Sequence, residues 1–154
     1  MRRALVGLAL GMLAACTEDP ALAPLTLHLV DDAPACLAVQ VAMVKSVEIT
    51  ALGTSAGGVT CQLDRACVEV SISSSLGALE DRLAAAPQPA LDVETGRLAN
   101  VQIRGYSLGG CAGDIQMCGI ADTDAAAAEM LAVPMVCDGR IGTRCAATTL
   151  PLCP

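Results

Sequence analysis

Cysteine is the residue type with the widest chemistry in this 154-residue chain, which contains nine of them. A cysteine thiol can form a disulfide, bind zinc, act in a redox dithiol or accept a covalent group. Zinc sites and redox dithiols favour pairs separated by two residues, whereas the close pairs here are separated by five, six and seven. The single histidine, His28, adds little to a ligand set. We therefore expect no metal ion and no other cofactor.

Cys16 follows a segment with the charge and hydropathy order of an export signal. Arg2 and Arg3 supply positive charge, and residues 4–13 form an uncharged apolar run. A membrane-spanning helix needs roughly 20 apolar residues, so this run is too short to cross a bilayer. The sequence Leu13-Ala14-Ala15-Cys16 closely resembles the lipobox of bacterial lipoproteins.

This resemblance implies a lipid anchor on Cys16. Residues 1–15 would be removed as a signal peptide, the thiol would carry a diacylglyceryl group, and residues 16–24 would tether the domain to the membrane. In lipoproteins an aspartate after the cysteine is associated with the inner membrane. Thr17 stands there in this chain, which implies the outer membrane, facing the periplasm or the cell surface. We expect a single domain over residues 25–154.

The other eight cysteines form an even set in a chain that carries an export signal. Disulfides form and persist in oxidising compartments, so we expect four of them. The sequence alone does not choose among the many possible pairings. Local pairing combined with one long closure favours Cys61–Cys67, Cys111–Cys118, Cys137–Cys145 and Cys36–Cys153.

A serine motif is the one feature that suggests catalysis. Gly105-Tyr106-Ser107-Leu108-Gly109 fits G-x-S-x-G, which presents a nucleophilic serine after a strand in α/β-hydrolases. In that fold the acid and the histidine follow the serine, whereas His28 precedes it here. Without a base, a serine hydroxyl is a weak nucleophile. Spacing permits a dyad with Lys45, but nothing favours it, and we expect no catalytic residue.

Several acidic residues and His28 are weaker candidates. Asp31-Asp32 and the pair Asp122 and Asp124 offer calcium-binding oxygens, but no twelve-residue ligand loop surrounds them. We expect these aspartates to cap turns or helices. His28 is expected to be a solvated strand residue, and residues 80–82 are expected to form the solvated side of a short helix.

Period-two alternation of apolar and polar residues dominates the chain after residue 25 and predicts strands. Turn signals separate the runs at Gly57-Gly58, Thr95-Gly96, Gly109-Gly110 and Asp138-Gly139. A sheet with one buried and one wet face is expected. The alternating runs cover residues 25–29, 38–43, 46–50, 67–73 and 101–104.

Two segments have helical signals. Ser75 can cap a helix that places Leu76, Leu79 and Leu83 on one stripe and ends before Pro87. Asp124 can cap a second over residues 125–131. The segment after it, Val133-Pro134-Met135, predicts an edge strand because proline lacks the amide hydrogen that an interior strand donates.

Part of the chain resembles the Ig-like or transthyretin-like sandwich domains of bacterial envelope lipoproteins. The resemblance lies in the strand at residues 101–106, the cysteine-bounded loop after it, and Cys118-Gly119. It implies a β-sandwich architecture. Together with the even cysteine count and the helix signal after Ser75, this leads us to expect a mainly β, disulfide-stapled β-sandwich with one short helix. The chain departs from immunoglobulin domains because it has no tryptophan and because Tyr106 lies five residues before Cys111. Only the architecture is carried over.

Composition narrows the classes of partner. The chain has one tyrosine, no phenylalanine and no tryptophan, so it lacks stacking surfaces for sugars and bases. Its formal charge of −7 becomes −9 once Arg2 and Arg3 leave with the signal peptide, which disfavours nucleic acid. We expect a cell-envelope lipoprotein that acts as a non-catalytic binding or structural module. Its partner would be an envelope protein, a peptide or a surface polymer, docked at a sheet edge near Pro134.

Two alternatives remain open at this point. The first is a small extracytoplasmic serine hydrolase that uses Ser107. The second is a disulfide-framed protease inhibitor, in which the loop between Cys61 and Cys67 presents Arg65.

Overall fold

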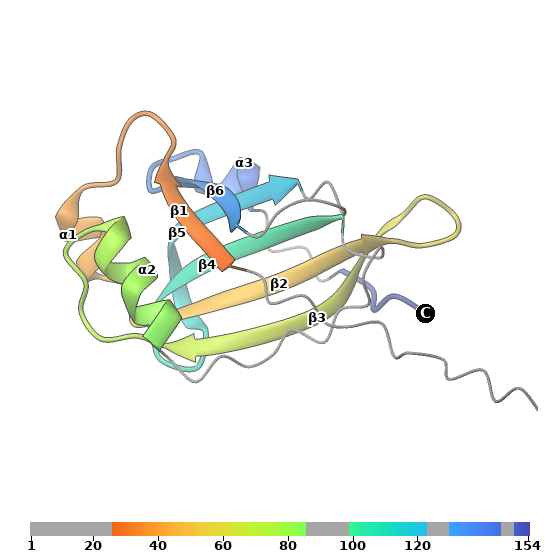
Figure 1. The fold of residues 1–154 in the computed structure, drawn as a ribbon, viewed down its shortest axis with the longest axis horizontal. Helices are drawn as coiled ribbons and strands as arrows, with labels where there is room; N and C mark the ends of the chain where they lie inside the picture. The colour runs from red at the N-terminus through yellow and green to blue at the C-terminus, as the bar shows by residue number, and fades with distance from the viewer. Residues whose placement is uncertain (1–25, 86–98, 123–129, 146–149) are drawn as a thin grey trace, which may run out of the picture.

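Six strands form one mixed sheet in the computed structural model, which describes residues 26–85, 99–122, 130–145 and 150–154 (Figure 1). The expected signal peptide, Cys16 and the tether lie outside these residues. The mainly β class expected from the alternation is confirmed. In chain order the strands are β1 (Thr26–Asp31), β2 (Ser46–Thr54), β3 (Thr60–Glu69), β4 (Asn100–Leu108), β5 (Ala112–Asp122) and β6 (Met130–Val136).

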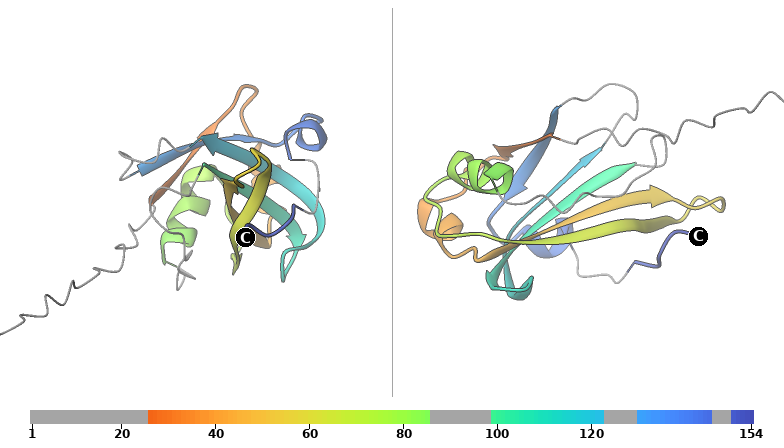
Figure 2. Two further views of the ribbon diagram at one scale, coloured as in Figure 1. Left: turned by 90° about the vertical axis from the view of Figure 1, so that its right-hand side faces the viewer. Right: turned by 60° about the horizontal axis from the view of Figure 1, so that its bottom comes forward.

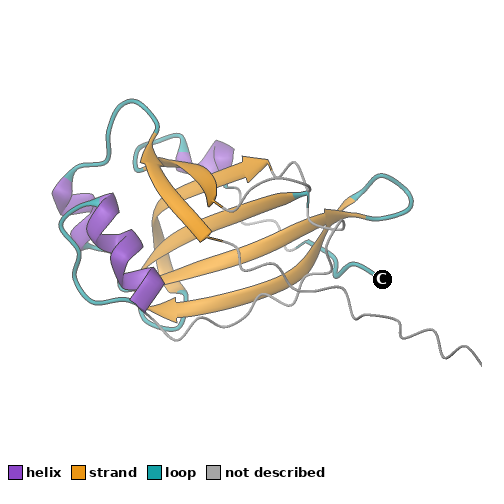
Figure 3. Cartoon of the chain, viewed as in Figure 1, coloured by secondary structure: helices purple, strands orange, loops and turns teal. Residues whose placement is uncertain are grey.

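Across the sheet the strands follow the order β1-β6-β5-β4-β2-β3. β1 and β6 are parallel, and all other neighbours are antiparallel. None of the helices in the described residues has the length and apolar character that crossing a bilayer requires. These helices are α1 (Ala38–Ala42), α2 (Leu76–Ala85) and α3 (Ile141–Arg144) (Figure 3).

The apolar core lies on one face of the sheet, which we call the core face, and α2 packs against it. Figure 2 shows α2 and α3 on opposite sides of a strongly twisted sheet. Successive β5 residues explain this arrangement, because Met117 belongs to the main core whereas Cys118 packs with Cys145 beside α3 on the outer face. The core face buries Val47, Ile49, Val101, Ile103, Val133 and Met135 against the leucines of α2.

The predicted helix after Ser75 is confirmed as α2. The backbone N–H of Ala78 donates to Ser75 Oγ at 3.2 Å, which satisfies one of the free amide groups of the first turn. Leu76, Leu79 and Leu83 are all buried, as their helical spacing predicted. The described part of α2 ends at Ala85, and Pro87 lies outside the described residues.

The strand predicted over residues 38–43 is wrong, because α1 occupies this segment. Val41 is buried, whereas Val39 and Met43 are exposed. The alternation of these three apolar residues is typical of a strand, but only Val41 packs in the core. The Leu37 amide donates to Gln40 Oε1 at 2.7 Å at the helix start, a local contact that favours a helical turn.

The edge strand predicted at Val133-Pro134-Met135 is also wrong. β6 lies between β1 and β5, with Pro134 opposite Val30 and Met135 opposite Gly119. The expected docking line near Pro134 is therefore occupied by other strands. Of the helix expected over residues 125–131, Asp124 and residues 125–129 lie outside the described residues, and Leu131 belongs to β6.

The sandwich type is not confirmed, since all named strands of the described residues belong to one sheet. The wet face expected for β2 is wrong as well. Ser46, Glu48 and Thr50 of β2 lie on the outer face, and each is at most 5% exposed. The alternation therefore predicted correctly which residues of β2 share a face, but it did not predict that both faces are buried.

All eight cysteines expected to form disulfides do so, but the favoured pairing is wrong. Cys61 and Cys67 both lie on β3, where six residues of extended chain span about 20 Å. A disulfide needs Cα atoms within about 7 Å, so these two cannot pair. The four bonds span 27 to 101 residues of sequence and join Cys36–Cys137, Cys61–Cys153, Cys67–Cys111 and Cys118–Cys145.

Gly119 of β5 lies too close to β6 to accept a side chain. A Cβ there would be 2.8 Å from the backbone oxygen of Pro134 and 2.5 Å from Met135 Sδ. We expect Gly119→Ala to lower the free energy of unfolding by about 1–3 kcal/mol, because the strands must move apart. Denaturant titration measures this change.

Gly77→Ala in α2 is the matched control, since an added Cβ there meets nothing within 4 Å. It should leave the free energy of unfolding unchanged or raise it by up to about 1 kcal/mol. A similar loss in both variants would contradict the close approach of β5 and β6.

Candidate functional site

The structure places Ser107 in a structural role at the end of β4. Its Oγ accepts a hydrogen bond from the backbone N–H of Asp114 at 3.0 Å, which closes the turn between β4 and β5. Gly113 fits against Ser107 in this turn with φ +81°, a conformation that favours glycine. The G-x-S-x-G motif therefore runs into a β-hairpin, whereas a nucleophile elbow runs from a strand into a helix.

His28, the histidine that a hydrolase would need, lies on β1. β1 and β4 are separated by β6 and β5, which places them about 14 Å apart at the usual strand spacing. His28 Nδ1 lies 3.0 Å from Glu80 Oε2, and the same carboxylate oxygen accepts the Leu29 N–H at 2.9 Å. Glu80 was expected to be solvated. Instead its carboxylate joins α2 to the edge strand β1 through His28 and the Leu29 N–H.

Lys45 comes nearer to Ser107 than His28 does. Its backbone N–H donates to the Tyr106 carbonyl at 2.8 Å, which places it beside the end of β4. The ammonium group, however, lies 3.5 Å from the Ala42 carbonyl, to which it donates. Ser107 and Lys45 thus lie on neighbouring segments. The Ser107 side chain bonds to Asp114, whereas the Lys45 side chain bonds to Ala42.

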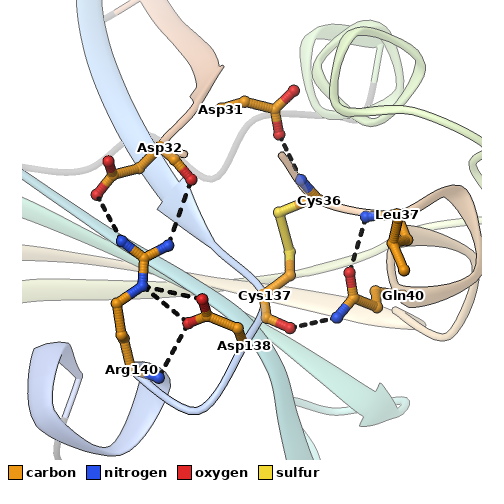
Figure 4. The surroundings of a disulfide bond; sticks show 8 residues. All are labelled: Asp31, Asp32, Cys36, Leu37, Gln40, Cys137, Asp138 and Arg140. Carbon is orange, nitrogen blue, oxygen red and sulfur yellow. Dashed lines mark hydrogen bonds and ion pairs between the residues drawn. A yellow bond between two sulfur atoms is a disulfide. The ribbon is translucent and has the colours of Figure 1, made fainter. Parts of the chain in front are cut away.

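The aspartates at the end of β1 hold the loop around one disulfide. Asp31 Oδ1 accepts a hydrogen bond from the Cys36 N–H at 2.8 Å. This contact lies beside the Cys36–Cys137 disulfide (Figure 4). Asp32 Oδ2 lies 2.6 Å from Arg144 Nη1. The expected turn-capping role is confirmed for Asp31. Within the described residues no group of three or more His, Cys, Asp or Glu side chains is placed to hold a metal ion.

The turn-capping role expected for Asp122 is not what the structure shows, since Asp122 bonds a side chain on the neighbouring strand. Asp122 Oδ1 accepts a hydrogen bond from the Asn100 side chain across β4 and β5, and Asp124 lies outside the described residues. Asp138 accepts from the Arg140 side chain at 2.9 Å, and this hydrogen bond lowers the pKa of Asp138 below its usual value of 3.8. The guanidinium thus stabilises the turn between β6 and α3.

The loop expected to present Arg65 to a protease is a strand. Cys61, Arg65 and Cys67 all lie in β3, and the two cysteines bond to Cys153 and Cys111. Arg65 pairs with Thr50 of β2. A substrate-like loop framed by Cys61 and Cys67 therefore does not exist.

A grouping of mostly polar side chains lies on the outer face, where three strands carry three residues each. We call these nine residues the Glu48 cluster, because Glu48 occupies its centre. The register of β4, β2 and β3 aligns them in three rows. The rows are Tyr106–Ser46–Glu69, Arg104–Glu48–Cys67 and Gln102–Thr50–Arg65.

Glu48 is 4% exposed and receives three polar contacts. Arg104 Nη1 lies 3.3 Å from Glu48 Oε1, and Arg65 Nη1 lies 3.4 Å from Oε2. The Tyr106 hydroxyl donates to Oε1 at 3.4 Å. Two guanidinium groups thus compensate the buried carboxylate, which burial alone would destabilise.

Three other members of the cluster, Ser46, Glu69 and Cys67, hold the turn between β4 and β5. Ser46 Oγ donates to the Leu108 carbonyl at 2.6 Å and accepts the Cys111 N–H at 2.9 Å. Glu69 accepts the N–H of Gly110. Because β2 lies between β3 and β4, the Cys67–Cys111 disulfide crosses over the start of β2 on the outer face.

The cluster could not be predicted from the sequence because its members come from three separate strands. Opposite charges at Glu48 and Arg104, each in an alternating run, and at Arg65 were the available signal, but strand register decides whether these side chains meet. No family model, curated protein or solved structure matches this chain. The cluster can neutralise charge and fix a turn, and it carries a disulfide at its rim.

Removal of the Glu48 charge tests the cluster. Glu48→Gln keeps the side-chain shape but leaves the positive charge of Arg104, whose side chain is 12% exposed, less compensated. We expect the free energy of unfolding to fall by about 2–4 kcal/mol, measured by denaturant titration. Arg65→Gln is the control, since its side chain is 60% exposed, and it should cost less than about 1 kcal/mol.

The Asp138–Arg140 contact predicts a pH dependence. Because folding lowers the pKa of Asp138, its contribution is present above the unfolded pKa and disappears as the pH falls through the folded value. Wild type should therefore unfold at higher denaturant than Asp138→Asn at neutral pH. The difference should vanish well below about pH 4.

Asp81→Asn, an exposed position of α2, controls for the loss of one surface charge. The comparison is made at low ionic strength, because salt weakens exposed ion pairs. A wild-type advantage over Asp138→Asn that stayed constant down to strongly acidic pH would rule out this origin.

Proposed function

We propose that the protein is a cell-envelope lipoprotein whose domain serves as a non-catalytic binding or structural module. The resemblance of Leu13-Ala14-Ala15-Cys16 to a lipobox supports the anchor. The four disulfides support export, because such bonds persist mainly in oxidising compartments. By the resemblance, Thr17 favours the outer membrane.

One observation carries the non-catalytic part of the proposal: Ser107 and His28 are committed to separate structural contacts. Ser107 Oγ closes a hairpin turn through the Asp114 N–H. His28 pairs with Glu80 and lies on β1, which β6 and β5 separate from β4. A serine nucleophile needs a base within hydrogen-bonding reach. These contacts favour a scaffold over a hydrolase.

The partner we propose is an envelope protein, a peptide or a surface polymer. Four long-range disulfides restrict motion of the domain, so a binding surface on it would lose little conformational entropy when a partner docks. The acidic balance of the chain disfavours nucleic acid. The lipid on Cys16 would hold the domain at the membrane.

The anchor is tested in bacterial cells fed an alkyne-tagged fatty acid. We expect wild type to incorporate the tag and to fractionate with membranes, because two or more acyl chains anchor stably. Cys16→Ser should lose both properties. Thr17→Ser, which keeps the cysteine and a small polar neighbour, should retain them, and an untagged wild type would refute the anchor.

The non-catalytic assignment is tested with a fluorophosphonate probe on purified protein. A binding module should stay unlabelled, since the single histidine, His28, pairs with Glu80 and not with Ser107. Labelling that Ser107→Ala abolishes and Ser74→Ala preserves would establish the hydrolase instead. Ser74 is a suitable control because it is exposed.

A further inference from the structure

We propose that Cys67–Cys111 is a thiol-exchange site, which an external dithiol opens and closes while the rest of the domain stays folded. This role goes beyond a binding module, because it assigns the domain a reversible covalent reaction. It depends on the exposure of the two sulfur-bearing residues, on the backbone at Cys111 and on the position of the bond in the sheet.

Exposure separates this disulfide from the other three. Cys67 is exposed and Cys111 is half-buried. Every other disulfide has at least one buried cysteine, at most 7% exposed. In Cys118–Cys145 both cysteines are at most 1% exposed. Thiol exchange requires a thiolate to reach a sulfur atom, so access favours Cys67–Cys111.

The backbone at Cys111 gives a second reason. Cys111 has φ +53°, the only non-glycine residue with positive φ among those described, and the preceding Gly110 has φ +69°. A non-glycine residue in this region costs about 1–3 kcal/mol. The disulfide is one of the contacts that hold Cys111 in this conformation, so the bond is formed at a strained position.

The position of the bond makes its opening local. Cys67–Cys111 joins β3 to the turn between β4 and β5 across β2, on the face opposite the main core. Opening it leaves the ladders between β4, β2 and β3 in place. The turn is still held by Ser46 and Glu69, which bind the N–H groups of Cys111 and Gly110.

Charge near the bond is balanced, because Glu48, directly opposite Cys67, is paired with Arg104 and Arg65. Arg65 and Glu69 lie two residues before and after Cys67 on the same face of β3. The positive group favours an approaching thiolate and the negative group opposes it. Access therefore sets the order in which the four disulfides react.

The reaction begins at the more exposed cysteine, Cys67. A thiolate of the external dithiol attacks Cys67 Sγ, a mixed disulfide forms, and the Cys67–Cys111 bond breaks with Cys111 leaving as a thiolate that water protonates. The second thiolate of the reagent then attacks its own sulfur in the mixed disulfide and releases Cys67. The protein gains two electrons and two protons, and the dithiol becomes a disulfide.

The test uses the full, oxidised chain under native conditions with a graded dithiothreitol series. Thiols are trapped by rapid alkylation and assigned by peptide mass spectrometry, while circular dichroism follows the fold. We expect Cys67 and Cys111 to be alkylated at least about tenfold faster than the other cysteines. The circular dichroism should not change during this phase.

Two double variants serve as controls. Cys67→Ser with Cys111→Ser should lose the fast phase, whereas Cys61→Ser with Cys153→Ser should keep it. A mass-tagged monothiol should be captured first at Cys67. Earlier opening of another pair, opening of all four in step with loss of the fold, or capture first at Cys111 would each overturn the proposal as stated.

Discussion

The side chains packed between the sheet and α2 are valine, leucine, isoleucine, methionine and alanine. An aromatic side chain buries roughly 150–250 Å², but the only tyrosine, Tyr106, contacts Glu48 on the outer face. Each core side chain thus buries a small apolar area, and all of them pack on one face of the sheet. Four disulfides, each contributing about 3.5–5 kcal/mol in the chain-entropy model, supply constraints that aromatic packing provides in other small domains.

Two of the long-range contacts lie at the borders of the sheet, where hydrogen-bond ladders end. On the β3 edge, Cys61–Cys153 holds residues 151–153 against the strand, and Gln62 exchanges backbone hydrogen bonds with this segment. On the β1 edge, Glu80 accepts the Leu29 N–H. Unpaired strand edges attract other chains. A disulfide at one edge and a helix carboxylate at the other therefore protect the sheet from unwanted pairing.

The sequence predicts elements where local periodicity and capping agree. Leucine spacing after Ser75 identifies α2 because both signals depend on neighbouring residues. The same reasoning fails for residues 38–43, since Val39, Val41 and Met43 alternate by coincidence while only Val41 reaches the core. It also fails for Pro134, whose strand is enclosed by partners from distant parts of the chain.

The Glu48 cluster could not be predicted for the same reason, because it depends on contacts between distant parts of the chain. Glu48, Arg65 and Arg104 meet only because β2 pairs with β3 and β4 in one particular register, which no local pattern reveals. The disulfide partners were equally nonlocal, although one expected bond could have been excluded. Once residues 60–69 form a strand, Cys61 and Cys67 are too far apart to join.

The disulfide connectivity also has a consequence for biosynthesis. Of the eight paired cysteines, the first three to be synthesised are Cys36, Cys61 and Cys67, and no two of them are partners in the folded protein. A nascent chain therefore carries three thiols whose partners are not yet synthesised. The partner of Cys36 follows 101 residues later. Any bond formed early among them has to be undone. Productive maturation thus calls for a setting in which disulfides are rearranged as readily as they are made.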